Sequence, residues 1–275
     1  MITASIVIHN SNEDLLKDTL HSLCREDIDI LYLIDNSQSD SLSKYQNFDK
    51  RIEYRHIENH GFGNAHNVAI RDALSRGSEF HLILNPDVRW DGHILPRLIE
   101  KLNSDGNIGL IQPRILYPDG SLQHTCRLLP RPYDVFAKRF LNNRFTRKNL
   151  DKYLLPENAY LHEFNAVYMQ GSFMLFKTGA LKEIGLFDER FFMYPEDIDI
   201  TRRIREKYKA VYFPEVSIIH NHAAESAKFG KMMFIHIWNM IKYFNKWGWF
   251  FDKKRTQLNK QLLEDIAGLI NNPAD

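Results

Sequence analysis

The alternation of short apolar runs with helix-like segments in residues 1–112 is the strongest constraint on the fold. The apolar runs predict five strands, at 5–9, 30–34, 52–57, 80–84 and 108–111. Segments with apolar residues at helical spacing predict three helices between them, at 12–24, 64–75 and 92–102. Strands separated by helices form βαβ units with parallel strands. We therefore predict an α/β fold with a Rossmann-like, mainly parallel central sheet and helices on both faces.

Regular patterns return only after a long irregular segment, residues 113–165. Within it, residues 127–152 hold eight Lys or Arg against two Asp or Glu, and the periodicity is poor. We interpret this segment as a basic insertion or lid, with a solvated basic face as the alternative. Beyond it, the patterns predict further strands and two helices: strands at 167–177, 210–213 and 216–219, and helices at 178–184 and 196–208.

Composition and charge exclude several classes of protein. The 36 Lys and Arg nearly balance the 35 Asp and Glu, and this formal net charge of +1 argues against a nucleic-acid partner. Two cysteines, Cys24 and Cys126, are too few for a disulfide framework or a Cys-rich zinc site. The first residues lack a signal-peptide pattern, and no run reaches roughly 18 apolar residues. We therefore expect a cytoplasmic protein, either soluble or peripheral to a membrane.

Polar residues follow three of the predicted strands at the point where each strand ends. These groups are His9-Asn10, Asp35-Asn36-Ser37 and Asn85-Pro86-Asp87. In an open α/β sheet, ligands bind outside the carboxyl ends of the strands, so the three groups predict one polar crevice. The alternative is turn chemistry, because short loops favour the same residue types.

The segment Asn59-His60-Gly61-Phe62-Gly63-Asn64-Ala65 begins the second predicted helix. It lacks the third glycine of a dinucleotide-binding loop and follows the third strand rather than the first. The two glycines favour a tight strand-to-helix turn with close backbone approach, and the helix N-terminus could also hold an anion.

Acidic residues in two places are candidates for metal binding and proton transfer. Asp87 follows a strand, where one carboxylate suits Mg²⁺ or Mn²⁺ that takes its other ligands from substrate phosphates. The run Pro195-Glu196-Asp197-Ile198-Asp199 follows four large apolar residues, and carboxylates in apolar surroundings suit general-base work. The alternative for this run is an ordinary helix start, which also favours acids. Of His220 and His222, either is a candidate metal ligand.

The sequence resembles glycosyltransferase family 2 enzymes with the GT-A fold, on the branch of bacterial rhamnosyltransferase-like enzymes that build surface polysaccharides. The motifs that carry the resemblance lie in order over residues 3–226: SIVIHN, IDNSQSD, NHGFGNAHNVAI, LNPDV, MQGSFMLFKTGALKEIGLFDERFFMYPEDIDITRRI and IIHNHAAES.

This resemblance implies a catalytic domain at 1–226 and a C-terminal helical segment at 227–275. Within the domain it implies a nucleotide-binding half (1–112), the basic insertion (113–165) and an acceptor and catalytic half (166–226). The implied reaction is an inverting transfer of a sugar from dTDP-rhamnose or a UDP-hexose to a hydroxyl of a growing, polyprenyl-diphosphate-linked surface glycan. The alternatives are a sugar-nucleotide nucleotidyltransferase and a non-catalytic glycan-binding module.

The resemblance also assigns roles to individual residues. It implies a catalytic base at Asp197 beside Glu196, and Mg²⁺ or Mn²⁺ held by Asp87 and His220. It implies contacts with the donor sugar and the acceptor at Gly171 and Ser172. It implies donor-nucleotide contacts at His9, Asn10, Asp35, Asn36, Gly63, Asn67 and Asn85. Two residues depart from the family pattern: Asn85 replaces the first carboxylate of the metal motif, and His9 replaces a tyrosine.

The C-terminal segment is basic and rich in aromatic residues. Residues 228–260 carry eight Lys or Arg and one acid, Asp252, and Phe234, Trp238, Ile241 and Phe244 recur at helical spacing. A basic amphipathic helix with tryptophan suits a membrane interface. The resemblance implies that this interface is the cytoplasmic face of the inner membrane. The alternative is a helix whose apolar stripe packs on the catalytic domain.

Overall fold

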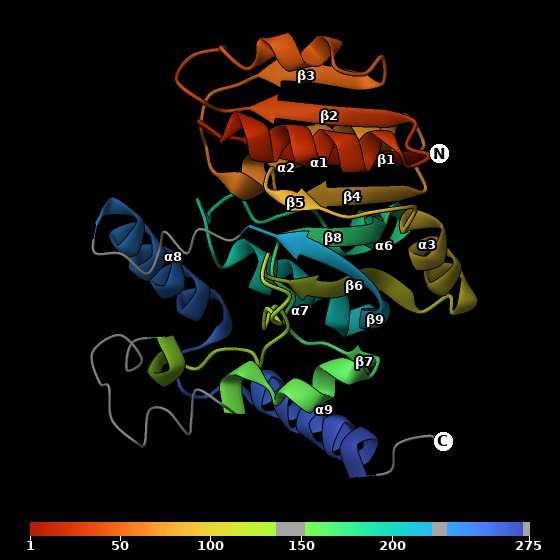
Figure 1. The fold of residues 1–275 in the computed structure, drawn as a ribbon. Helices are drawn as coiled ribbons and strands as arrows, with labels where there is room; N and C mark the ends of the chain where they lie inside the picture. Colours follow the sequence, from red (N-terminus) through yellow and green to blue (C-terminus); the bar gives the residue numbers. More distant parts are fainter. Residues whose placement is uncertain (136–151, 222–229, 272–275) are drawn as a thin grey trace.

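The structure is a computed structural model that describes residues 1–135, 152–221 and 230–271. It contains a central sheet flanked by helices (Figure 1). The strands are β1 (Ile2–Ile8), β2 (Ile30–Asp35), β3 (Ile52–His56), β4 (Phe80–Leu84), β5 (Val88–Arg89), β6 (Ile108–Leu116), β7 (Phe164–Asn165), β8 (Phe173–Lys177) and β9 (Lys209–His220). The helices are α1 (Glu13–Cys24), α2 (Phe62–Ser75), α3 (Leu95–Ser104), α6 (Thr178–Ile184), α7 (Glu196–Lys207), α8 (Lys231–Trp247) and α9 (Lys253–Asn271). Two short 3₁₀ turns, η1 (Ser43–Asn47) and η2 (Glu157–Leu161), complete the described elements.

The predicted α/β class is confirmed, and the sheet combines parallel and antiparallel pairing. Its order is β3-β2-β1-β4-β8-β6-β9-β5, with β7 also paired to β9. Strands β3, β2, β1 and β4 are parallel, as are β6 and β9, whereas β8 runs antiparallel to both of its neighbours. Strand β8 is reversed because the chain enters it at the carboxyl end of β4, where Phe173 pairs with Leu84.

Two strand predictions in the second half are corrected by the structure. The alternating pattern at 167–177 forms a strand only from Phe173, because residues 167–172 make turns and an isolated bridge instead. The predicted strands 210–213 and 216–219 are one strand, β9. Its pairing with β6 shifts register between Pro113 and Arg114, where Pro214 cannot donate a ladder hydrogen bond.

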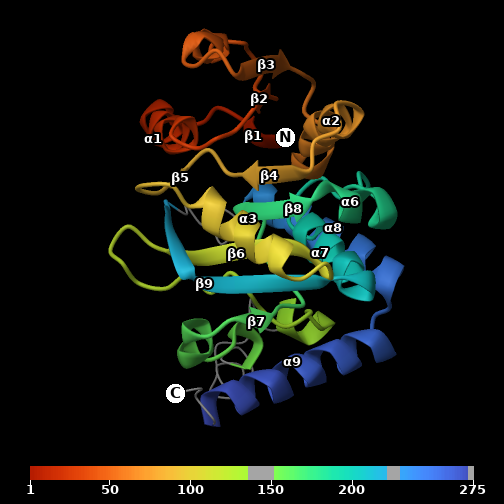
Figure 2. The ribbon, with the colours of Figure 1, turned by 90° about the vertical axis from the view of Figure 1, so that its right-hand side faces the viewer.

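Helices cover both faces of the sheet (Figure 2). Helix α1 lies on one face and α2, α6 and α7 lie on the other. Each helix presents an apolar stripe to the sheet, such as Leu16, Leu20 and Leu23 in α1. In α2 the stripe consists of alanines, Ala65, Ala69 and Ala73, so this helix lies close to β1 and β2. Both cysteines are free thiols, as the sequence predicts.

The C-terminal helices pack against α7. Arg202 of α7 makes two hydrogen bonds to Asp252, of 2.7 and 2.8 Å, and both side chains are buried. Asp199 of α7 accepts from Nε1 of Trp247 at 2.8 Å and pairs with Lys246 at 2.5 Å. Tyr243 and Phe244 of α8 are fully buried. The tail does pack, but not through the predicted stripe: Phe234 and Trp238 are 60% and 61% exposed, and the buried face of α8 holds Met240, Tyr243 and Phe244. No helix among the described residues is long and apolar enough to cross a membrane.

Buried histidines join β1, β4 and α2 beneath the crevice edge. The hydroxyl of Ser5 lies 2.8 Å from Nδ1 of His66 and 2.9 Å from Nε2 of His81, and Nδ1 of His81 lies 2.8 Å from the Thr3 hydroxyl. Burial lowers the pKa of His66, and it lowers the pKa of His81 to about 3. The folded protein therefore keeps both imidazole rings neutral at pH values at which exposed histidines become charged.

We predict that this network makes stability depend on pH. The unfolded chain takes up a proton on His81 below about pH 6.5, whereas the folded chain does so only near its lowered pKa. The stabilisation is present above pH 6.5 and is lost as pH falls. Relative to His81→Gln, the wild-type free energy of unfolding in urea should fall by about 1.4 kcal/mol per pH unit below 6.5. The same substitution at the exposed His93, His93→Gln, serves as the control. An equal dependence of the free energy of unfolding on pH in wild type and His81→Gln would contradict the prediction.

Candidate active site

The carboxyl ends of β1, β2 and β4 meet at one edge of the sheet, as the sequence predicts. Ile8 pairs with Asp35, and Ile6 pairs with Leu84, so the residues that follow the three strands start at neighbouring positions. This edge brings together His9-Asn10, Asp35-Asn36-Ser37 and Asn85-Pro86-Asp87. Turn chemistry also operates here, because these side chains hydrogen-bond to one another's backbone.

Asp35 fixes the loop at the end of β2. Its side chain is fully buried, and its two oxygens accept from Ser37 N at 2.9 Å and from the Tyr54 hydroxyl at 2.7 Å. The Ser37 hydroxyl in turn accepts from Asn10 N at 2.9 Å, and Asn10 adopts a left-handed φ of 49°. The loops after β1 and β2 are thus tied together before any ligand binds.

The neighbouring pair His9 and Asn36 completes this corner. Nδ1 of His9 lies 3.0 Å from the Asn36 carbonyl oxygen, and Asn36 Nδ2 donates to Asn59 Oδ1 at 3.3 Å. The side-chain oxygen of Asn36 is buried and has no partner among the described residues. A buried acceptor without a donor is costly unless a ligand supplies one.

Asn85, Asp87 and His220 converge at the ends of β4 and β9. Asp87 Oδ1 lies 3.3 Å from Nε2 of His220, and Asn85 Nδ2 lies 3.4 Å from the same nitrogen. Strand β5 holds this arrangement in register, because Val88 pairs directly with His220. His222, the other sequence candidate, lies outside the described residues.

Gln123 determines which nitrogen of His220 faces Asp87. Its amide nitrogen donates to the carbonyl oxygens of His220 at 2.7 Å and Leu116 at 3.3 Å. Its amide oxygen must therefore be the atom that lies 2.9 Å from Nδ1 of His220, so that Nδ1 carries the proton. In the neutral ring, Nε2 then presents its lone pair to the Asp87 carboxylate.

This donor set fits a divalent cation. A lone pair and a carboxylate that face each other at 3.3 Å can share a metal ion, and a metal-bound histidine commonly donates its other N–H to a side-chain or backbone oxygen. Among residues 1–135, 152–221 and 230–271, no group of three or more His, Cys, Asp or Glu could hold a metal. Two protein ligands suit Mg²⁺ or Mn²⁺, which keep open positions for phosphate oxygens.

Glu196 and Asp197 lie in the first turn of α7, and both are buried. Asp197 accepts from Ile198 N at 2.7 Å and from Gly171 N at 3.0 Å. One Glu196 oxygen and the Ser172 hydroxyl are buried without a partner among the described residues. These two groups and the Asp197 carboxylate give this end of the crevice its hydrogen-bonding capacity.

Burial raises the pKa of both carboxyl groups. Loss of solvent is the largest cause for each, and the charge of Asp197 raises the pKa of Glu196 further. The backbone N–H groups of Gly171 and Ile198 oppose the shift at Asp197. The backbone thus favours a charged Asp197 beside a more readily protonated Glu196, a difference that suits a general base.

Gly171 and Ser172 connect the carboxylate pair to the Asp87 end of the crevice. Ser172 accepts through its carbonyl oxygen from Asn85 N at 3.0 Å, while Gly171 N donates to Asp197. A side chain at Gly171 would contact Phe62 and Asp197. The segment Gly171–Ser172 therefore contacts the end of β4 through Ser172 and the start of α7 through Gly171.

The glycine-rich start of α2 supports the loop that leads into α7. A Cβ on Gly61 would lie 2.1 Å from the carbonyl oxygen of Phe192, which also accepts from Phe62 N at 3.0 Å. Gly63 lies against Phe187, and the buried Asn67 bonds both N and O of Phe187. The structure thus places Gly63 and Asn67 in packing contacts with this loop, and their predicted nucleotide contacts stay predictions.

Several residues of the site carried no recognisable signal in the sequence. Gln123 lies in the irregular segment, and Tyr54 lies inside a strand. Asn239 of α8 holds the loop before α7 by accepting from Phe192 N at 3.4 Å and donating to Met193 O at 3.1 Å. Its position as a polar residue inside an aromatic helix is the one feature that could have indicated this role.

Known proteins share the sequence pattern and the fold of this chain. The sequence family described as "Glycosyl transferase family 2" matches residues 3–176, well over half of the chain. The chain is 28% identical over 153 residues to an N-acetylglucosaminyl-diphospho-decaprenol L-rhamnosyltransferase of Mycobacterium tuberculosis, a match that covers 54% of this chain and 48% of that protein. The matched region thus spans about half the length of this curated relative.

A second relative matches over most of both chains. The chain is 23% identical over 248 residues to the rhamnosyltransferase WbbL of Escherichia coli, covering 86% of this chain and 90% of that one. Among solved structures, GalNAc-T7 with UDP, GalNAc and Mn²⁺ superposes with a TM-score of 0.63 at 15% identity, covering 99% of this chain and 58% of that one. This likeness shows that the two share the GT-A fold. The match over residues 3–176 shows that the chain is a member of glycosyltransferase family 2.

Proposed function

We propose that the protein transfers a sugar, with inversion, from a nucleoside diphosphate donor to a hydroxyl of a lipid-linked surface glycan. The observation that carries this proposal is the short segment Gly171–Ser172, which joins the Asp87 end of the crevice to the buried Asp197. The relatives named as rhamnosyltransferases favour dTDP-rhamnose as the donor, with a UDP-hexose as the alternative. The decaprenol-linked substrate named for one relative supports a polyprenyl-diphosphate-linked acceptor.

The donor binds along the carboxyl ends of β1, β2 and β4 in this proposal. Asn36 offers a buried oxygen that a nucleobase N–H can satisfy, and the fixed Asp35 loop holds it in place. His9 and Asn10 lie beside it, and Asn85 lies toward the diphosphate. Asp87 and His220 would hold Mg²⁺ or Mn²⁺, which supplies positive charge for the leaving diphosphate when it is bound.

The reaction is a single displacement. Asp197 accepts the proton of the acceptor hydroxyl while that oxygen forms a bond to the anomeric carbon of the donor sugar. The bond from that carbon to the diphosphate breaks on the opposite face, so the configuration inverts. General-base assistance of this kind contributes typically 10²–10⁴-fold to the rate. Ser172 and Glu196, which each carry a buried unpartnered oxygen, are placed to bind sugar hydroxyls.

Removal of the base should abolish transfer but not donor binding. We expect Asp197→Asn to lower kcat by about 10²–10⁴-fold and to leave the affinity for UDP or dTDP unchanged by isothermal titration. Because burial raises the pKa of Asp197, wild-type kcat/KM should fall on the acid side at a pH above about 4, the ordinary aspartate range. Glu196→Gln is the matched variant. Full activity of Asp197→Asn would remove Asp197 as the base.

Gln123 should control metal affinity through His220. Gln123→Leu removes the acceptor for Nδ1–H and should weaken Mn²⁺ binding about 10–100-fold, measured by isothermal titration in saturating UDP. Gln123→Glu keeps an oxygen at this place and should retain most of the affinity. Asp87→Asn provides the positive control. Unchanged Mn²⁺ affinity in both Gln123→Leu and Asp87→Asn would place the metal elsewhere.

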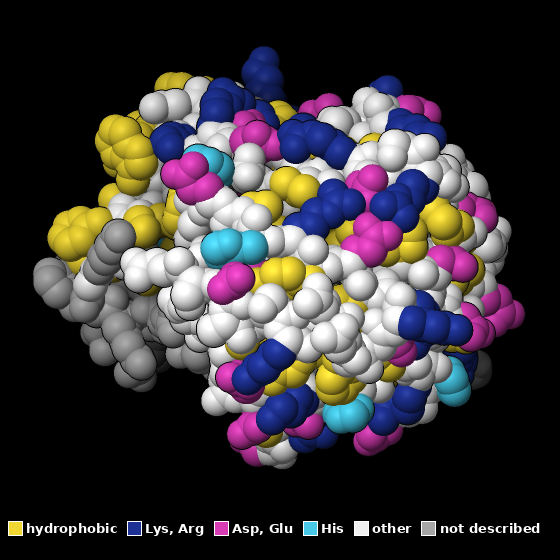
Figure 3. Space-filling view, turned by 90° about the horizontal axis from the view of Figure 1, so that it is seen from above, with side chains coloured by type: hydrophobic (Ala, Val, Ile, Leu, Met, Phe, Trp, Pro, Cys, Tyr) yellow, Lys and Arg dark blue, Asp and Glu magenta, His cyan; other side chains and the backbone are white. Residues whose placement is uncertain are grey.

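The outer surface of α8 supports contact with a membrane. Trp238 is 61% exposed, and the turn before α9 carries Phe251, which is 99% exposed. Lys253 and Lys254 are exposed next to this turn, and the acid between them and Phe251, Asp252, is buried. Seen from above, hydrophobic side chains gather on the side where α8 lies (Figure 3). Exposed aromatics beside lysines suit the anionic, cytoplasmic face of the inner membrane.

Truncation of these aromatics should weaken membrane binding. We expect Trp238→Ser with Phe251→Ser to lower partition into vesicles of phosphatidylglycerol and phosphatidylcholine at least 10-fold in flotation, since each buried ring contributes about 1.5–3 kcal/mol. Added salt should weaken the binding of the wild-type protein to these vesicles, because salt screens the attraction between its lysines and the anionic lipid. Leu161→Ser removes an equally exposed apolar side chain, 63% exposed, from η2 and should have no effect. Equal flotation of the double variant and wild type would reject this surface.

A further inference from the structure

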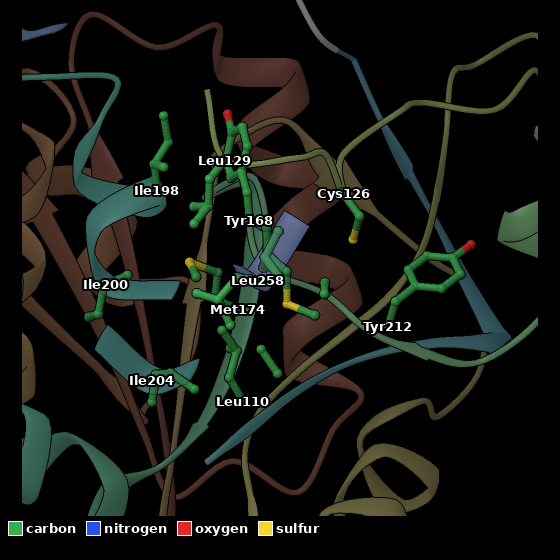
Figure 4. Packing of buried hydrophobic residues seen from close by; sticks show 14 of the residues in the cluster. Leu110, Cys126, Leu129, Tyr168, Met174, Ile198, Ile200, Ile204, Tyr212 and Leu258 are labelled. Atoms are coloured by element: carbon green, nitrogen blue, oxygen red, sulfur yellow. The ribbon is translucent and has the colours of Figure 1, made fainter. Parts of the chain in front are cut away.

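Arg127 lies beside the catalytic carboxylates, and the proposed reaction does not use it. Residues 125–127 run antiparallel to residues 168–170, with Arg127 N donating to Tyr168 O at 3.3 Å. The next residue along, Gly171, donates to Asp197. Tyr168 belongs to one of these segments and Leu129 follows the other, and both share a hydrophobic cluster with Ile198 of α7 (Figure 4). Residues 125–127 therefore lie directly beside the segment whose Gly171 N–H donates to Asp197.

The guanidinium of Arg127 is surrounded by phenols. Its Nε donates to His124 O at 2.8 Å, and its centre lies 5.6 Å from the Tyr168 ring centroid. Burial raises the pKa of the nearby Tyr153 hydroxyl, and the positive charge of Arg127 opposes that shift. Arg127 is partly exposed, and within residues 1–135, 152–221 and 230–271 no carboxylate oxygen lies within 4.0 Å of it. Arg131, in the same segment, pairs with Asp134. A partly desolvated guanidinium without a carboxylate partner is suited to an anionic ligand.

The charges of Arg127 and Asp197 interact without forming an ion pair. Burial is the main influence on the pKa of Asp197 and raises it, while the positive charge of Arg127 acts to lower it. The two groups are thus close enough for their charges to act on each other, but farther apart than a salt bridge. A sugar ring that presents a hydroxyl to Asp197 can extend its opposite end toward Arg127.

We propose that Arg127, with Tyr153 and Tyr168, forms an anion site that holds the diphosphate of a lipid-linked acceptor while its sugar hydroxyl meets Asp197. This inference rests on the proposed glycosyl transfer and adds the acceptor's diphosphate as a recognised group. The planar guanidinium can bind two phosphate oxygens at once, and the phenolic hydroxyls can donate to others. Recognition at this anion site requires a diphosphate ester in the acceptor and does not depend on which sugar the diphosphate carries.

The test uses a simple lipid diphosphate as the probe. Wild type, saturated with UDP and Mn²⁺ to fill the donor site, should bind undecyl diphosphate, and inorganic pyrophosphate should compete with it. We expect Arg127→Met to weaken undecyl diphosphate binding at least 10-fold, with unchanged affinity for UDP and for undecyl glucoside. Arg127→Lys keeps the charge but not the planar fork and should lose less. Arg131→Met, from the same segment, should bind like wild type.

Three results would overturn the proposal. They are equal undecyl diphosphate binding in Arg127→Met and wild type, an equal loss of undecyl glucoside binding, or probe binding with which pyrophosphate does not compete. Thermal melting of each variant checks its fold, and Arg127→Lys replaces Arg127→Met if that variant does not fold. A wild-type chain that binds the probe through Arg127 but transfers no sugar would keep this site and contradict the proposed function instead.

Discussion

Two adjacent carboxyl groups are buried at the start of α7, and much of the surrounding structure compensates for that burial. An isolated buried carboxylate costs several kcal/mol unless hydrogen bonds or charges offset the cost. The N-terminus of α7 and the N–H groups of Gly171 and Ile198 offset it at Asp197, whereas one Glu196 oxygen has no partner in the part of the chain that the structure describes. The close approach of Gly61 to Phe192 and the clamp of Asn67 on Phe187 then hold the loop that delivers both residues. Reactivity and local structure therefore depend on the same few contacts.

The C-terminal helices belong to this arrangement. The buried pair of Arg202 and Asp252 and the contacts of Asp199 with Lys246 and Trp247 connect α7 to α8 and α9. Breaking such a pair leaves an uncompensated buried charge, which typically costs 3–5 kcal/mol. The tail thus has two faces with separate physical roles. Its inner face contacts α7 and the loop before it, and its outer face carries exposed aromatic side chains, which we propose contact a membrane.

The sequence predicts the first half of the fold well because each element there has a local cause. The strands β1, β2 and β4 are short apolar runs, and Asn12 accepts from Asp14 N and Leu15 N to begin α1. The reversed direction of β8 and the single strand β9 were not predictable, because both depend on where the chain returns to the sheet. The residues at the strand ends, including Asp35 and Asp87, are predictable because their positions follow directly from the apolar runs before them. Gln123 and Arg127 are not, because their roles come from pairing with distant segments.

The charges at the site are arranged in the direction in which the reaction moves charge. In the proposed reaction, the acceptor loses its proton to Asp197 while negative charge leaves with the donor diphosphate toward Asp87 and His220, whose side chains would hold a cation. At the other end, burial raises the pKa of Asp197 and the positive charge of Arg127 opposes that shift without forming an ion pair, which in the proposed reaction would leave Asp197 available to the acceptor. The formal net charge of the chain is only +1, and it does not reveal this arrangement. The proposed transfer depends on two acidic ends, Asp87 and the pair Glu196–Asp197, which the short neutral segment Gly171–Ser172 connects through hydrogen bonds to Asp197 and to Asn85.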